Sequence, residues 1–134
     1  CKTIGRFLQR RTRLRLHRSP LLRLMVGYHV TRKELLPFIV SQGLLPQVPD
    51  DMEDIKGVYL FKSIEDMNNA LMNWMGEKMD EWEEENNKLW EEIYIKVDLK
   101  DLEIYDSVEY EWTCLEVISP QRFLQITETE KELI

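Results

Sequence analysis

Residues 27–46, with the sequence GYHVTRKELLPFIVSQGLLP, decide the fold of this chain. The first five are typical of a short strand whose end carries His29 and Thr31, and the apolar segment that follows is typical of a helix. Gly43 is a natural end for that helix, because glycine adopts a left-handed backbone without strain. Two polar side chains at the end of a strand can hold a ligand if they face a cleft, so we expect the functional site here.

The start of this helix can be interpreted in two ways. Thr31 and Glu34 match the Ser/Thr-x-x-Glu capping box, in which the threonine side chain caps the helix. Pro37 favours a later start, with the proline in the first turn, or a bend at that point, because a proline deep in a helix removes a hydrogen bond and clashes with the preceding turn. A threonine that caps a helix can also contact a ligand, so Thr31 stays in the candidate site under either interpretation.

The charge of the chain is strongly asymmetric. Residues 1–24 contain eight of the 18 basic residues and no acidic residue, whereas the rest of the chain has 10 basic and 25 acidic residues, a net charge of −15. We therefore predict a basic N-terminal arm over residues 1–24, a domain over residues 25–127 and a frayed tail over residues 128–134. The arm could bind nucleic acid or an acidic partner, act as a targeting-like presequence, or be a cloning artefact that precedes Met25.

Length and cysteine content limit the class of protein. A chain of 134 residues has room for one domain with a core of its own. Its two cysteines, Cys1 and Cys114, have no spacing that suggests a zinc site or a redox pair, so no metal is expected and a reducing cytoplasm is the simplest setting. No apolar run approaches the roughly 20 residues of a membrane-spanning helix. We expect a soluble cytoplasmic protein with no membrane partner.

The chain after residue 46 alternates connectors, strands and helices. Residues 46–56 are acidic, contain prolines and are typical of a solvated connector. Residues 57–61, GVYLF, are typical of a buried strand, and Ser63 is a natural cap for the helix that follows. Apolar residues at helical spacing then predict one long helix, or two helices joined near Gly76. We assign these apolar residues to the core: Met67, Ala70, Leu71, Trp74, Met75, Met79 and Trp82.

The other face of this helical segment is acidic. Its charged side chains are Asp80, Glu81, Glu83, Glu84 and Glu85. Such a run is most simply a solvated surface, and it could also dock a basic protein partner. Beyond it, residues 92–99 alternate as a strand with one buried face, residues 107–118 are read as one alternating segment, and residues 123–126 suggest a final short strand.

The order of these motifs resembles that of the ADP-ribosyltransferase-like fold, whose active sites are summarised as His, Tyr and Glu on three strands. Residues 28–31, YHVT, are similar to the first motif of that family, and residues 57–61 to the second. Glu111, nine residues before Pro120, is similar to the glutamate of the third motif. The resemblance covers about residues 25–126 and implies an α+β domain with a split antiparallel sheet flanked by helices.

The resemblance implies how NAD would be held. His29 would hydrogen-bond a ribose hydroxyl of NAD, the backbone around Val30 would hold the nicotinamide amide, and Tyr59 would stack near the nicotinamide ring. An aromatic face is a suitable partner for a flat cationic ring. Thr31 and Ser63 complete the expected NAD-binding set.

Glu111 is the carboxylate that the resemblance makes catalytic. It would accept a hydrogen bond from the nicotinamide ribose and stabilise the positive charge that develops as the glycosidic bond breaks. Glu109 and Glu116 compete for this role. Strand alternation places Glu109 and Glu111 on one face, whereas the spacing to Pro120 favours Glu111. Such a pair could share the activation of an acceptor, or it could be a solvated edge.

Two features depart from the family pattern. Poly-ADP-ribosyltransferase-like members carry a serine and a second tyrosine in the second motif, and the equivalent spacing from Tyr59 falls on Met67 and Ala70. This departure weakens the expected nicotinamide pocket. The arginine that toxin members place in the first motif is not evident, although Arg32 is near.

The resemblance therefore implies an NAD-dependent ADP-ribosyltransferase that uses NAD as its substrate. It would release nicotinamide and transfer ADP-ribose to a macromolecular acceptor, either protein or nucleic acid. The alternative is a non-enzymatic acidic binding or inhibitor protein on the same scaffold, which would occupy a basic site as a nucleic-acid mimic does. Removal of a 2′-phosphate from RNA fits less well, because the domain has no basic cluster to hold that phosphate.

Overall fold

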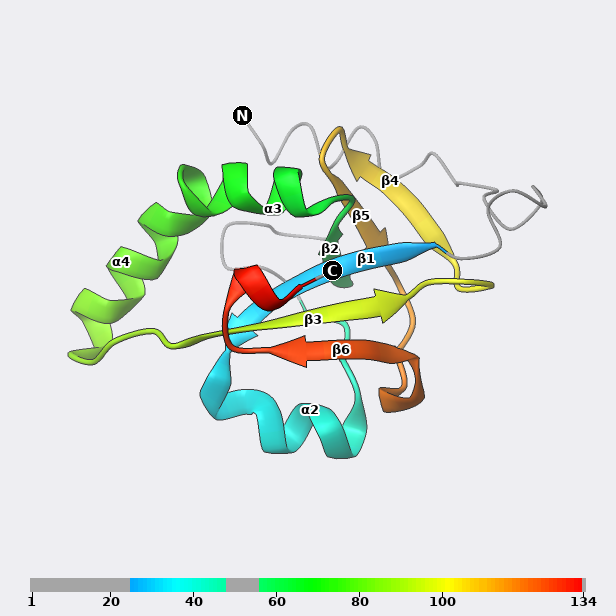
Figure 1. Ribbon diagram of the computed structural model, residues 1–134, viewed down its shortest axis with the longest axis horizontal. Helices are drawn as coiled ribbons and strands as arrows, with labels where there is room; N and C mark the ends of the chain where they lie inside the picture. The colour runs from blue at the N-terminus through cyan, green and yellow to red at the C-terminus, as the bar shows by residue number, and fades with distance from the viewer. Residues whose placement is uncertain (1–24, 48–55, 134) are drawn as a thin grey trace.

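A six-stranded antiparallel sheet and three α-helices make up the described part of the chain, which comprises residues 25–47 and 56–133 of a computed structural model (Figure 1). The strand order is β4-β5-β2-β1-β3-β6. This arrangement confirms the predicted α+β class. The predictions for the basic arm and for residues 48–55 of the acidic connector lie outside the described residues.

The elements follow one another in this order: β1 (Val26–Arg32), η3 (Lys33–Leu35), α2 (Leu36–Gln42), β2 (Val58–Phe61), α3 (Ile64–Leu71), α4 (Trp74–Asn86), β3 (Glu92–Asp98), β4 (Ile104–Val108), β5 (Glu111–Cys114), η4 (Pro120–Arg122), β6 (Phe123–Thr127) and η5 (Glu130–Glu132). The elements prefixed η are single turns of 3-10 helix. Among the described residues no helix is both long enough and apolar enough to cross a membrane.

The sheet is opened between β1 and β2. β1 pairs with β3 along its whole length, from Val26 opposite Asp98 to Arg32 opposite Glu92. Its pairing with β2 is limited to Tyr28 opposite Phe61. Beyond that pair the two strands separate, so the residues that follow Tyr28 in β1 border an opening in the sheet.

Both faces of the sheet are buried by apolar side chains. On one face, Ile39 of α2 packs in a cluster with Leu60 and Ile95. On the other face, Met67 of α3 packs with Tyr28 in a second cluster, and burying a side chain such as Met67 contributes about 1.5–3 kcal/mol. In the view of Figure 1, α2 lies below the sheet, α3 lies above it, and α4 runs down its left side.

The capping-box prediction at Thr31 is wrong. Thr31 lies inside β1 opposite Ile93, and the ladder between β1 and β3 holds it in an extended conformation. α2 begins at Leu36 with Pro37 in its first turn, as the later start requires. Gly43 ends the helix with a φ of +87°, which confirms the predicted glycine stop.

The helical segment after Ser63 is two helices. The Ser63 side chain accepts a hydrogen bond from the backbone N–H of Asp66 at 3.0 Å, which confirms the predicted cap. The break between α3 and α4 falls at Met72 and Asn73, whereas Gly76 lies in the first turn of α4. Of the predicted core stripe, Met67, Ala70 and Met79 are buried, and Leu71, Trp74, Met75 and Trp82 are partly buried.

The prediction that residues 107–118 form one alternating segment is wrong as well. The first residues of this segment end β4, Glu109 and Tyr110 form a turn, and β5 begins at Glu111. Glu109 is therefore exposed in the turn, whereas Glu111 is buried in a strand, and the two do not share a strand face. The end of the chain also differs from the frayed tail that was expected, because η5 follows β6 and Leu133 is buried in the core.

Candidate functional site

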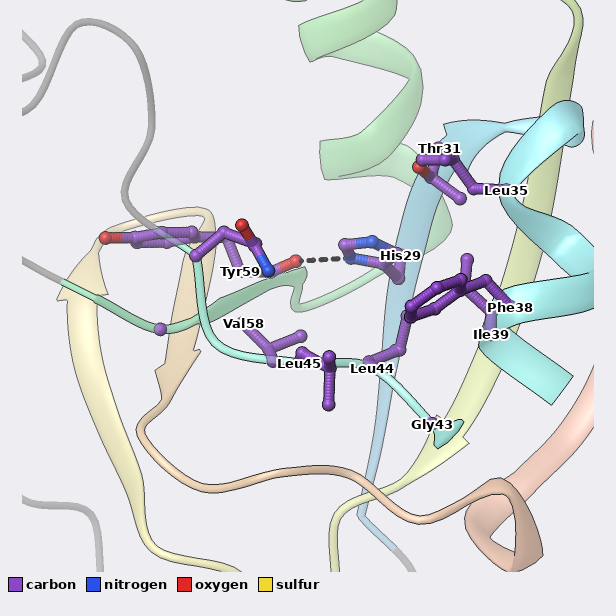
Figure 2. Close-up of a pocket in the computed structure, with 12 residues that line it drawn as sticks. His29, Thr31, Leu35, Phe38, Ile39, Gly43, Leu44, Leu45, Val58 and Tyr59 are labelled. Carbon is purple, nitrogen blue, oxygen red and sulfur yellow. Dashed lines mark hydrogen bonds between the residues drawn. The ribbon is translucent and has the colours of Figure 1, made fainter. Parts of the chain in front are cut away.

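A cavity of about 430 Å³ lies between the open edge of β1, the start of β2 and α2 (Figure 2). The polar side chains of His29, Thr31 and Gln47 line it together with Tyr59. Its remaining walls are these residues: Leu35, Phe38, Ile39, Gly43, Leu44, Leu45, Gly57 and Val58. A largely apolar hollow with a few converging polar groups is the usual form of a small-molecule site.

His29 is held in a defined orientation at this cavity. Its Nδ1 lies 2.9 Å from the backbone carbonyl oxygen of Tyr59, and this contact spans the opening between β1 and β2 (Figure 2). A carbonyl oxygen only accepts hydrogen bonds, so Nδ1 carries the proton and donates it. Burial lowers the pKa of the His29 imidazole, and this outweighs the opposite effect of the hydrogen bond to Tyr59. The ring is therefore neutral at pH 7, with Nε2 as a hydrogen-bond acceptor.

The lowered pKa of His29 predicts a loss of stability in mild acid. Above the ordinary histidine pKa of 6.5 the ring is neutral in both states, and as the pH falls below it the unfolded chain takes up a proton that the folded protein does not. The free energy of unfolding of the wild type should thus fall more than that of His29→Gln between about pH 7.5 and 5.5. Urea titrations at the two pH values measure this difference, and equal losses would contradict it.

Tyr59 contributes its backbone to the site in a way that the sequence did not suggest. Its carbonyl oxygen fixes His29, and Figure 2 shows its ring extending away from the imidazole. Its neighbours Val58 and Leu60 face the core on the α2 side of the sheet. The structure joins Tyr59 and His29 through a main-chain contact.

Glu111 lies on the other side of the sheet from His29. It is opposite Phe61 in the β2–β5 ladder, and Phe61 is opposite Tyr28 in β1, so these three side chains share the face that α3 covers. His29, one residue after Tyr28, points to the opposite face. Glu111 is 2% exposed and is not among the residues that line the cavity. The structure therefore does not bring the imidazole and this carboxylate into one crevice.

Two other predicted site residues, Val30 and Ser63, support the fold and lie outside the cavity lining. The Val30 side chain is buried in the cluster beside α3, and Ser63 caps that helix. Neither lines the cavity. Met67, at the position where the resemblance implies a serine, fills the same cluster with Phe61. The space next to Glu111 on this face is thus occupied by core side chains.

Arg32 is held away from the cavity. Its guanidinium lies over the rings of Trp82 and Trp90, at 4.8 Å and 5.5 Å from their centroids, and its Nε is 2.9 Å from the Glu34 carboxylate. These contacts give the arginine a structural role at the end of β1. None of the described residues that line the cavity carries a charge at neutral pH.

Phe38 is one of the lining residues that were not predicted from the sequence. It lines the cavity from α2 and is 56% exposed, which is unusual for a phenylalanine. A signal was present in the run from Leu35 to Val40, which has more apolar residues than one buried face of a short helix requires. At least one of them had to face solvent or a ligand.

Comparison with known proteins does not assign the chain to a family. Comparison of the sequence with protein-family models and with curated proteins gave no match to either. The functional inference therefore rests on the oriented imidazole, the apolar cavity and the separate buried carboxylate.

Proposed function

We propose that this chain binds NAD beside His29 and transfers its ADP-ribose to a macromolecular acceptor, as ADP-ribosyltransferase-like proteins do. The observation that carries the proposal is the fixed orientation of His29, whose Nδ1 donates to the Tyr59 carbonyl at 2.9 Å. Its Nε2 is left as an acceptor suited to a ribose hydroxyl. The single pair that joins β1 to β2 also supports the split sheet that the resemblance implies.

The reaction needs no change of oxidation state. The bond between the ribose C1′ and the nicotinamide nitrogen breaks, the electron pair leaves with nicotinamide, and a nucleophilic atom of the acceptor bonds to C1′ and loses a proton. A carboxylate stabilises the positive charge that develops on the sugar. In this proposal Glu111 has that role, and because it is 2% exposed, the side chains that cover it have to move before the sugar can reach it.

A second candidate function has an observation of its own. His29 and Glu111 lie on opposite faces of the sheet, so the described residues favour ligand binding more directly than they favour turnover. Exposed acids on α4 include Asp80, Glu81 and Glu84. A non-enzymatic binding protein with an acidic surface, directed at a basic partner, would have both features.

Labelled NAD tests the proposal. The wild type should bind NAD and release nicotinamide, and His29→Ala should weaken NAD binding about tenfold, because it removes a hydrogen bond to the ribose in a largely apolar cavity. His17→Ala is the matched control, since it makes the same substitution outside the described residues. Isothermal titration calorimetry measures binding, and chromatography of the label measures nicotinamide release.

Binding of NAD without release of nicotinamide would reject the transferase activity and favour a non-enzymatic binding protein. Absence of NAD binding would reject NAD both as a substrate and as a ligand. In that case tight binding of a basic protein, weakening steeply as salt is raised, would support the acidic-surface function.

A further inference from the structure

We propose that Phe38, rather than Tyr59, supplies the aromatic face of this site, and that the cavity takes an uncharged nucleoside: a flat ring against Phe38, with a ribose hydroxyl that donates to His29. This inference deepens the proposed function and rests on it for the identity of NAD as the whole ligand. The nucleoside could equally be free or be one end of a dinucleotide.

The placement of the aromatic rings supports the claim that Phe38, rather than Tyr59, supplies the aromatic face. Phe38 projects from α2 into the cavity and lies beside His29 in Figure 2, whereas the ring of Tyr59 extends away from the imidazole. Phe38 keeps 56% of its surface exposed while its neighbour Ile39 is buried in the core. An exposed ring on one wall of a hollow is available to stack with a flat ligand, and stacking between bases and aromatic side chains is tolerant of the base.

The absence of charged side chains in the lining supports the claim that the nucleoside is uncharged. The described residues that line the cavity offer neutral polar groups on His29, Thr31 and Gln47, and the other lining residues are apolar apart from Tyr59, whose ring extends away from the imidazole. Arg32, the nearest arginine in the sequence, is engaged with Glu34 and with two tryptophan rings. A phosphate or a cationic ring that entered this space would lose water without gaining an opposite charge.

Calorimetric titrations with adenosine, NAD and NADP test both parts. Phe38→Ala should weaken the binding of adenosine and of NAD by at least about fivefold, the lower end of the range for base–aromatic stacking, and Phe38→Trp should restore it. Val40→Ala is the matched control, because Val40 is an exposed apolar residue of the same helix that does not line the cavity. NADP, which carries a phosphate on the adenosine ribose, should bind at least about tenfold more weakly than NAD.

The outcomes separate this inference from the proposed function. Adenosine binding that depends on Phe38, in a protein that does not bind NAD, would support the nucleoside site and reject NAD as its ligand. NAD binding that is equal in the wild type and Phe38→Ala, or NADP binding as tight as NAD binding, would overturn the inference and leave the proposed function standing. Failure of the wild type to bind either adenosine or NAD would overturn the inference.

Discussion

Replacing Gly43 with alanine should lower the free energy of unfolding by about 3 kcal/mol or more. Gly43 has φ +87° and ψ −172°, a conformation that is essentially restricted to glycine. A Cβ atom at this position would lie 2.2 Å from the backbone oxygen of Ile118. That oxygen accepts the N–H of Leu44 at 2.9 Å, so the clash would also disturb the bridge that holds Leu44 and Ile118 in the core.

Urea unfolding of the variant measures this effect. Gln42→Ala is the control, because Gln42 is an exposed residue at the end of α2 and should change stability by less than about 0.5 kcal/mol. Gly43 and Leu44 also form part of the cavity wall, so the Gly43 variant should bind its ligand more weakly even where it remains folded. A Gly43→Ala protein as stable as the wild type would show that the chain can leave this conformation without cost.

The features that were predicted well from the sequence depend on local chemistry. The Ser63 cap needs only a side-chain oxygen three residues before a backbone N–H, and Gly43 needs only its own lack of a side chain. β2 and β6 were found because apolar residues cluster between residues that break regular structure. Each of these signals lies within a few residues of the feature it predicts.

The features that were predicted badly depend on partners far away in the chain. Thr31 and Glu34 fit a capping box, but the ladder with β3, about 60 residues later, keeps Thr31 in a strand. The turn at Glu109 and Tyr110 contains no glycine, proline or asparagine, so no residue there indicated that two strands meet. That hidden turn is what made Glu109 and Glu111 look equivalent.

Only part of the candidate site was predicted, because the rest depends on residues far apart in the chain. His29, Thr31 and Tyr59 come together because β1 and β2 are neighbours in the sheet, and short motifs in order were sufficient to suggest this. The face on which Glu111 lies depends on the register of three strands, which periodicity within one strand cannot supply.

Glu111→Gln should slow nicotinamide release about 10²- to 10³-fold if the chain is the proposed transferase. Glutamine keeps the shape of the buried side chain and removes the negative charge that would stabilise the developing oxocarbenium ion. Glu109→Gln is the matched control, because Glu109 is exposed in the adjoining turn and should leave the rate unchanged. Single-turnover measurements with labelled NAD give the rate of release, and thermal unfolding of each variant shows that the fold is retained.

This measurement decides whether His29 affects the affinity for NAD and Glu111 affects the rate of nicotinamide release. His29 would contact the ribose in the ground state, so its loss should weaken NAD binding, whereas Glu111 would act on a charge that exists only in the transition state, so its loss should lower the rate with little change in affinity. Because the two residues lie on opposite faces of the sheet, one ligand could contact both only if β1 and β2 moved apart. An unchanged rate in Glu111→Gln would remove this carboxylate from the chemistry and confine the ligand to the His29 side.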